Sequence, residues 1–342
     1  MIKKILLAIG LILTASAVAV AIYISTSGPS LPTNTDEIIS QVKASELPEL
    51  VRGTTGYAKS GDVNIWYELI EPAETPRGTI LLMTGIATDA ISWPPKLIDE
   101  FTKAGYQVVR YDHRDTGMSD WLENWDSENP YSLGDMANDG VAVLDALSID
   151  NAHVFGVSMG GMVAQQMSIH HTERVASLTS IMSSCDIVDP ELPPISLDTV
   201  KEFAKVSARY GLFPNERNII KLQVASRIIL KGYATYDIDV QAVAEQVLYN
   251  LRERQGFNPQ AAIQQNTAVL VSGSRYEQLR SLHTPTLIIH GQKDPLIPFE
   301  HGLKCADLIP DAATLWVDQM GHDLPDSTID EIVDKTIAHF ND

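Results

Sequence analysis

A serine stands between glycines in the segment Gly156 to Gly160 (GVSMG), which has the spacing G-x-S-x-G. This pattern alone is weak evidence, because about one chain in ten of this length would contain it by chance. Its position is more informative: the apolar run Ala152–Val157 predicts a strand, and a helix is predicted from Gly160 to His170. A strand–turn–helix junction of this kind exposes a serine hydroxyl for nucleophilic attack, whereas an ordinary tight turn would leave a solvated serine. We therefore predict that Ser158 is a nucleophile.

A serine hydroxyl needs a base at neutral pH, and the sequence offers nine histidines. His322 follows the last predicted strand, Thr314–Val317, while Asp294 follows the predicted strand Thr286–His290. A carboxylate there can accept the imidazole Nδ1–H, fix the tautomer and stabilise the imidazolium. The chain order Ser158, Asp294, His322 is also the order typical of a nucleophile placed on a strand–helix turn. We predict that these three residues form a catalytic triad.

Acyl transfer also needs donors for the developing oxyanion. The backbone N–H of Met159 follows the nucleophile directly, and Ile86 lies in the loop after the predicted strand Thr79–Thr84. We predict these two amides as the oxyanion hole, with Gly85 shaping the second loop and tolerating side chains poorly. Trp93 and the Met159 side chain are predicted as walls of an apolar substrate pocket.

The elements that must position these residues alternate between strands and helices. Besides the strands above, Val63–Ile70, Gln107–Asp112 and Val175–Met182 are predicted strands; Lys96–Ala104, Leu133–Leu147 and Ile329–Phe340 are predicted helices. Repeated strand–helix–strand units predict an α/β fold with a mostly parallel sheet and helices on both faces. In such a sheet the chemistry lies at the strand carboxyl ends. Residues 186–265 interrupt the rhythm and are predicted to form a helical cap within a domain spanning 56–342.

Residues 56–342 resemble the α/β-hydrolase family. The segments Arg110 to Gly117 (RYDHRDTG) and Gly156 to Gly161 (GVSMGG), with Trp93-Pro94 and Met320-Gly321-His322, resemble its aclacinomycin methylesterase branch. The resemblance implies hydrolysis of a small carboxylic ester through an acyl-enzyme, with no metal or organic cofactor.

The same resemblance implies that Asp112, Arg114 and Gly117 form a structural turn and take no part in the chemistry. The chain departs from the family at Thr84-Gly85, because many members have His-Gly at the oxyanion loop. Backbone donors can survive this change, whereas the substrate is not implied, since the cap is the least recognisable part of the chain.

The N-terminus contains Lys3 and Lys4 and then 20 uncharged residues from Ile5 to Ile24. As a helix this stretch would span about 30 Å, the thickness of a bilayer core. We predict residues 1–24 to be an uncleaved membrane anchor, with the catalytic domain on the periplasmic side. The alternative is a signal peptide cleaved after Ala15-Ser16-Ala17, which would release an exported protein. Residues 25–55 are predicted to be a tether.

The composition restricts the classes of partner that the chain can bind. Its 25 Lys/Arg against 44 Asp/Glu give a formal charge of −19, which disfavours nucleic acid as a partner. The two cysteines, Cys185 and Cys305, show no metal-ligand spacing; the sequence favours two buried thiols over a disulfide. It does not indicate an oligomeric state.

The predicted function is a serine hydrolase, most simply a carboxylesterase. An epoxide hydrolase or dehalogenase is disfavoured, because these enzymes need a carboxylate where the chain has Ser158. Two alternatives stay open: hydrolysis of an amide or carbon–carbon bond by the same triad, and a membrane-tethered binding protein that kept the fold without catalysis.

Overall fold

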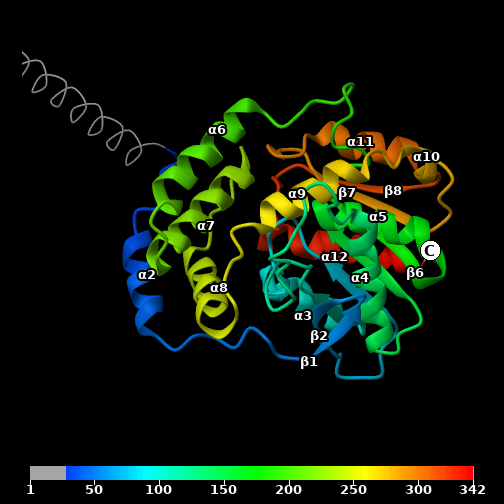
Figure 1. Cartoon of the computed structure of the whole chain (residues 1–342), viewed down its shortest axis with the longest axis horizontal. Helices are drawn as coiled ribbons and strands as arrows, with labels where there is room; N and C mark the ends of the chain where they lie inside the picture. The colour runs from blue at the N-terminus through cyan, green and yellow to red at the C-terminus, as the bar shows by residue number, and fades with distance from the viewer. Residues whose placement is uncertain (1–27, 342) are drawn as a thin grey trace, which may run out of the picture.

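A computed structural model of the chain describes residues 28–341. Eight strands form one sheet with the order β1-β2-β4-β3-β5-β6-β7-β8 (Figure 1). The pairs β1–β2 and β2–β4 are antiparallel, and the remaining pairs are parallel. The strands are β1 (Thr54–Ser60), β2 (Val63–Ile70), β3 (Thr79–Met83), β4 (Gln107–Tyr111), β5 (Ala152–Val157), β6 (Val175–Ile181), β7 (Thr286–Gly291) and β8 (Ala313–Val317).

Helices cover both faces of the sheet, as the strand–helix alternation predicts. Helices α3 (Pro95–Lys103) and α12 (Asp326–Phe340) contact each other on one face, and α4 (Leu133–Ala146) and α5 (Met159–His170) contact each other on the opposite face. The other helices of this part are α9 (Ala261–Ser272), α10 (Tyr276–Leu279) and α11 (Phe299–Leu308). This arrangement confirms the predicted α/β fold class.

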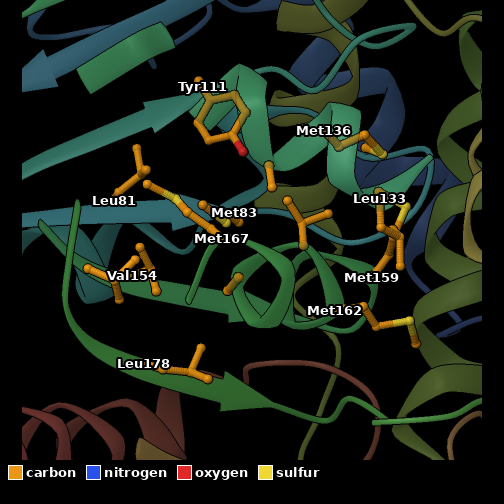
Figure 2. Close-up of a cluster of buried hydrophobic side chains, with 14 of the residues drawn as sticks. Leu81, Met83, Tyr111, Leu133, Met136, Val154, Met159, Met162, Met167 and Leu178 are labelled. Atoms are coloured by element: carbon orange, nitrogen blue, oxygen red, sulfur yellow. The ribbon is translucent and has the colours of Figure 1, made fainter. Parts of the chain in front are cut away.

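The buried strand β3 shows why the sheet needs two layers of helices. All five of its residues are buried, and alternate side chains enter different cores. Ile80 and Leu82 pack with α3 and α12, whereas Leu81 and Met83 pack with α4 and α5. Figure 2 shows the second core, in which Met83 and Met167 lie between the strands and the helices.

Three helices of the predicted insertion lie beside the carboxyl ends of the strands, outside the two helical layers (Figure 1). They are α6 (Leu197–Val206), which continues into a π-helical turn at Ser207–Gly211, α7 (Glu216–Lys231) and α8 (Val240–Glu253). We call these three helices the cap. The predicted insertion ends at residue 265, within helix α9. Because α9 contacts α4, it belongs to the core layers, and the chain leaves the cap before residue 261.

Residues 28–53, within the predicted tether, contain a helix at the place where the sequence between Asp36 and Leu47 favours one or two amphipathic turns. Helix α2 (Thr35–Ala44) buries Ile39 and Val42 against α7 and α8, because its apolar residues share one face. Asp36 pairs with Arg217 and Lys221, and Lys43 pairs with Glu216. The predicted tether therefore contains a helix that packs against the cap, and its last residues already belong to β1.

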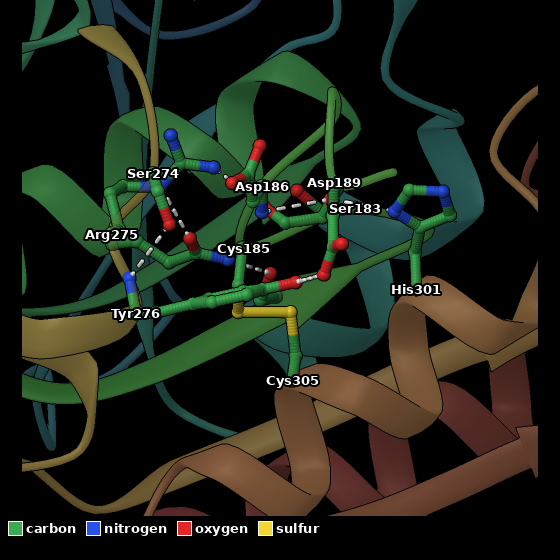
Figure 3. The surroundings of a disulfide bond; sticks show 12 residues. Ser183, Cys185, Asp186, Asp189, Ser274, Arg275, Tyr276, His301 and Cys305 are labelled. Carbon is green, nitrogen blue, oxygen red and sulfur yellow. Dashed lines mark hydrogen bonds between the residues drawn. A yellow bond between two sulfur atoms is a disulfide. The ribbon is translucent and has the colours of Figure 1, made fainter. Parts of the chain in front are cut away.

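The prediction of two buried thiols is wrong, because Cys185 and Cys305 form a disulfide (Figure 3). Cys185 follows β6 and Cys305 lies on α11, with a Cα–Cα distance of 5.7 Å. The 120 residues between them in the sequence concealed a proximity that only the fold creates.

The predicted membrane segment, residues 1–24, lies outside the described residues. Between residues 28 and 341, none of the helices combines the length and the apolar character needed to cross a bilayer.

Candidate active site

The turn between β5 and α5 holds Ser158 in a strained backbone conformation, with φ 55° and ψ −122°. Its neighbours must be glycines: a Cβ on Gly156 would lie 2.2 Å from the carbonyl oxygen of Gly160, and a Cβ on Gly160 would lie 2.1 Å from that of Met83. The Ser158 N–H donates to Ile181 O at 2.9 Å. These contacts hold the serine at the carboxyl end of the parallel strands.

His322 lies between the nucleophile and a carboxylate. Its Nε2 is 2.9 Å from Ser158 Oγ, and its Nδ1 is 2.7 Å from Asp294 Oδ2. With the ring proton on Nδ1, the imidazole donates to Asp294 and accepts from the Ser158 hydroxyl. The backbone N–H of His322 donates to Leu230 O of α7 at 2.8 Å, so the loop carrying this histidine is attached to the cap.

Asp294 is fixed by hydrogen bonds from its own loop. Its Oδ1 accepts the backbone N–H groups of Leu296 and Ile297 at 2.8 and 2.9 Å. Burial alone would raise the pKa of this carboxyl group, but the neighbouring His322 and His290 hold the pKa well below its usual range. Asp294 is therefore ionised at neutral pH and can orient the His322 ring. His290, the penultimate residue of β7, is fully buried, and its Nε2 lies 3.4 Å from Asp294 Oδ2.

The two amides predicted as oxyanion donors belong to Met159, which follows the nucleophile, and to Ile86, which lines the cavity at Ser158. Neither the N–H of Met159 nor that of Ile86 has an acceptor within residues 28–341, so both can donate to a substrate. A Cβ on Gly85 would lie 3.4 Å from Ser158 Cβ and 3.8 Å from its Oγ, which places this loop against the nucleophile. Amides without an acceptor near a nucleophile are what an oxyanion hole requires, and the role of this pair stays a prediction.

Two side chains that the sequence did not single out hold the Thr84–Thr88 loop. Gln265 of α9 accepts the Ala87 N–H at 2.7 Å and donates to Arg114 O at 2.9 Å. His113 is completely buried, and its Nε2 lies 3.2 Å from Thr84 O. Neither has a local sequence signal, because its partner is more than 25 residues away in the chain.

The segment from Asp112 to Gly117 is a structural turn, as the resemblance implied. Asp112 accepts the backbone N–H groups of Ala90 and Met118, and Arg114 forms a buried ion pair with Asp139. Gly117 has φ 51°, and a Cβ there would overlap the Asp112 carboxylate. These residues shape the loops next to the site and do not contact Ser158.

A cavity of about 340 Å³ opens at Ser158 and His322. Its walls come from the Thr84–Asp89 loop and from the cap. Trp93 lines it, whereas the Met159 side chain belongs to the core between the sheet and α4 (Figure 2). The predicted wall role of the Met159 side chain is therefore wrong, because the first turn of α5 directs it inward. The cap residues in the wall are Phe203, Gln223, Ser226, Arg227, Leu230, Val243, Gln246, Val247 and Asn250.

Comparison with known proteins gives one family and several relatives. Residues 78–326 match the model of the alpha/beta hydrolase fold family. The chain is 27% identical to rhodomycin D methylesterase of Streptomyces peucetius over 291 residues, covering 81% of this chain and 95% of that protein. It is also 27% identical to 3-oxoadipate enol-lactonase 1 of Acinetobacter baylyi, covering 65% of this chain and 74% of that protein.

Solved structures share the architecture. A meta-cleavage product hydrolase from Pseudomonas fluorescens superposes with a TM-score of 0.60 at 21% identity, covering 86% of this chain and 99% of the hydrolase. An esterase from Exiguobacterium antarcticum superposes with a TM-score of 0.57 at 17% identity, covering 85% and 100%. At such identities the similarity concerns the fold alone.

Proposed function

The chain belongs to the α/β-hydrolase fold family, and we propose that it is a carboxylic ester hydrolase that acts through an acyl-enzyme on Ser158. Ser158 Oγ attacks the ester carbonyl carbon while His322 Nε2 takes its proton. The amides of Met159 and Ile86 stabilise the oxyanion. His322 then returns the proton to the leaving alcohol, and the carbon–oxygen bond to that alcohol breaks.

Deacylation repeats the sequence with water. His322 removes a proton from the water as it attacks the acyl carbon, and then protonates Ser158 Oγ as the acid leaves. Asp294 keeps the ring proton on Nδ1 in both half-reactions and stabilises the imidazolium.

One observation supports this proposal most strongly: the continuous hydrogen-bonded series from Ser158 Oγ through His322 to the ionised Asp294, at 2.9 and 2.7 Å. A non-catalytic binding protein of this fold would need neither the series nor the strained serine. Relatives that are a methylesterase and an enol-lactonase favour ester bonds over amide or carbon–carbon bonds.

The bond type is tested with a substrate panel on the purified enzyme. Methyl and p-nitrophenyl esters should be hydrolysed, the matched amides and a β-diketone should not, and Ser158→Ala should abolish turnover. Cleavage of the β-diketone without ester turnover would replace the esterase assignment with carbon–carbon hydrolysis.

We also propose that residues 1–24 anchor the enzyme in the membrane, with the catalytic domain on the periplasmic side. Helix α6 and the turn after it carry exposed apolar side chains: Leu197 and Val200 near the start of the helix, and Leu212 and Phe213 after the turn. Gly28 lies next to the same helix, since a Cβ there would be 3.3 Å from the buried Val206. The described part of the chain thus starts beside a helix that also exposes apolar side chains, which are suited to contact lipid.

The charge of the segment containing α6 and α7 also favours contact between this part of the molecule and the membrane. Between Leu197 and Lys231 the chain has seven Lys/Arg and three Asp/Glu, although the whole chain is strongly acidic. Basic side chains next to exposed apolar residues attract anionic lipid, and Lys201, Lys205 and Arg209 lie on α6 and the turn after it. Cell fractionation tests the anchor: activity should stay in the carbonate-washed membrane pellet. Soluble protein whose first residue is Val18 would instead identify a cleaved signal peptide.

A further inference from the structure

Arg227 is a cation in the wall of the cavity that contains Ser158 and His322. It lies on α7, one turn before Leu230, whose carbonyl oxygen accepts the N–H of His322. Near this helix the cavity wall combines the apolar Leu230, Val243 and Val247 with uncharged polar side chains, and Arg227 is the cation among them. An arginine in such a wall loses hydration, and it normally needs a carboxylate in return.

Arg227 has no such carboxylate. Its Nη2 donates to Gln246 Oε1 at 2.8 Å, and Gln246 Nε2 in turn donates to Ile91 O at 2.8 Å. Within residues 28–341, no Asp or Glu oxygen lies within 4.0 Å of this guanidinium. Its Nε and Nη1 have no acceptor there, and neither is a fully buried atom. Both nitrogens are therefore at least partly accessible and can donate to a ligand.

The other buried arginines show what is unusual here. Arg110 pairs with Glu68, Arg114 with Asp139 and Arg254 with Asp112. Arg275 lacks a carboxylate but donates to a side-chain amide and two backbone carbonyls, through Nε, Nη1 and Nη2. Of these five, only Arg227 combines guanidinium donors that lack an acceptor with a place in the wall of the cavity.

We propose that Arg227 binds a carboxylate of the substrate, so that the preferred esters contain a carboxylate in addition to the ester group. This inference rests on the proposed esterase function and specifies its substrate class. Nη1 has two N–H groups and Nε has one, so the guanidinium can donate charged hydrogen bonds to a substrate carboxylate while Nη2 keeps its bond to Gln246. Gln246, held by Ile91 O, fixes the guanidinium before the substrate arrives. Arg227 contacts the unreactive end of the substrate and takes part in no bond change.

The surrounding charges keep Arg227 available for this role. Burial lowers the pKa of the guanidinium, while the more distant Asp323, Tyr236 and Asp239 raise it. The Asp323 carboxylate accepts the Tyr236 hydroxyl, so it already has a donor of its own. An alternative role for Arg227, as a longer-range counter-ion of Asp323, is distinguished by the experiment below.

The test compares ligands that differ only in charge. Calorimetry on the Ser158→Ala protein measures the binding of monomethyl glutarate and of its neutral amide, methyl glutaramate, which differ on the acyl side of the ester. A second pair, 4-acetoxybenzoate and 4-acetoxybenzamide, places the charge on the alcohol side. In at least one pair the carboxylate should bind about 10- to 100-fold more tightly, as charged hydrogen bonds allow. Because this measurement needs no turnover, it can succeed even if ester hydrolysis fails.

Variants of Arg227 test whether this residue causes the preference for the carboxylate. Arg227→Gln should remove the preference for the carboxylate and leave binding of the amide unchanged, and Arg227→Lys should retain part of the preference. Arg217→Gln is the matched control, since Arg217 lies on the same helix and pairs with Asp36 outside the cavity. Equal affinity for both members of each pair would overturn the inference. A fall in thermal midpoint without a selective loss of carboxylate binding would assign Arg227 to the counter-ion role.

Discussion

At the scale of single residues, the site is defined by close backbone approach as much as by its reactive side chains. Ser158 adopts a positive φ that few residues other than glycine adopt, and the packed β5–α5 turn maintains it. Gly156 and Gly160 touch backbone atoms, so no side chain fits there. Gly85 differs from both, because a methyl group would meet only the side chains of Ser158 and Thr88 at ordinary contact distances.

We therefore expect Gly85→Ala to fold with a thermal midpoint close to that of the parent and to lose activity. Its methyl group would stand 3.8 Å from Ser158 Oγ, where the ester must approach. A displaced oxyanion donor costs a factor of about 10² to 10³ in kcat. Steady-state kinetics with a p-nitrophenyl ester measures the loss. Unchanged kcat would mean that this loop does not shape the oxyanion hole.

His113 predicts a dependence of stability on pH. Burial lowers its pKa from 6.5 to about 4, so between these values the unfolded chain binds a proton that the folded chain does not. The free energy of unfolding should therefore fall as the pH drops from about 6.5 to about 4. Between pH 7.5 and 5 this residue should account for about 2 kcal/mol.

Urea unfolding at the two pH values measures this effect. His113→Asn should be less stable than the parent at pH 7.5, but should lose about 2 kcal/mol less on acidification. Equal losses in the parent and the variant would show that His113 titrates normally.

At the scale of elements, α2 and the cap form one packed unit. Ile39 and Val42 lie in a cluster with Val243 and Val247 of α8, two residues that also line the cavity. The N-terminal segment thus supports a wall of the active site without touching the substrate. Gln265 likewise holds the Thr84–Thr88 loop without touching the substrate, because it accepts the Ala87 N–H.

Ile39→Ala should lower the free energy of unfolding by about 2–5 kcal/mol and loosen α8. We expect faster amide hydrogen exchange in α8 and a higher KM for esters, because the cavity wall loses its support. Glu37→Ala, on the exposed side of the same helix, is the control and should change neither. Exchange that is unaffected in α8 would separate α2 from the cap.

The sequence was most informative where local pattern and packing agree. The bounds of β2 and β5 were predicted to the residue, since continuous or alternating apolar runs end at clear turn signals. β1 was missed because TTGYAKS has a single buried residue, and its pairing with β2 decides its structure. The packing of α2, the disulfide and the unpaired donors of Arg227 all depend on segments far apart in the chain, which no local pattern reveals.

At the scale of the whole molecule, the disulfide links the loop after β6 to α11, and its two cysteines are 120 residues apart in the sequence. Asp189 and Tyr276 meet next to it (Figure 3). Disulfides persist mainly outside the cytoplasm, which agrees with the proposed periplasmic location.

Replacing both Cys185 and Cys305 by alanine should lower the free energy of unfolding by about 2–5 kcal/mol. The parent protein with reductant should approach the stability of the variant, and the reductant should not affect the variant itself. Denaturant unfolding with and without reductant checks this. Equal stability of parent and variant under oxidising conditions would show that the bridge does not contribute.

The most direct test of the account is fluorophosphonate labelling of a chain beginning at Gly28, which keeps α2 on the cap. The reagent reports an activated serine and requires no knowledge of the substrate. We predict a single adduct, located by mass spectrometry on Ser158, that is absent in Ser158→Ala and strongly reduced in His322→Ala. Well-folded protein that takes up no label, or takes it up at another serine, would contradict the assignment of Ser158 as the nucleophile.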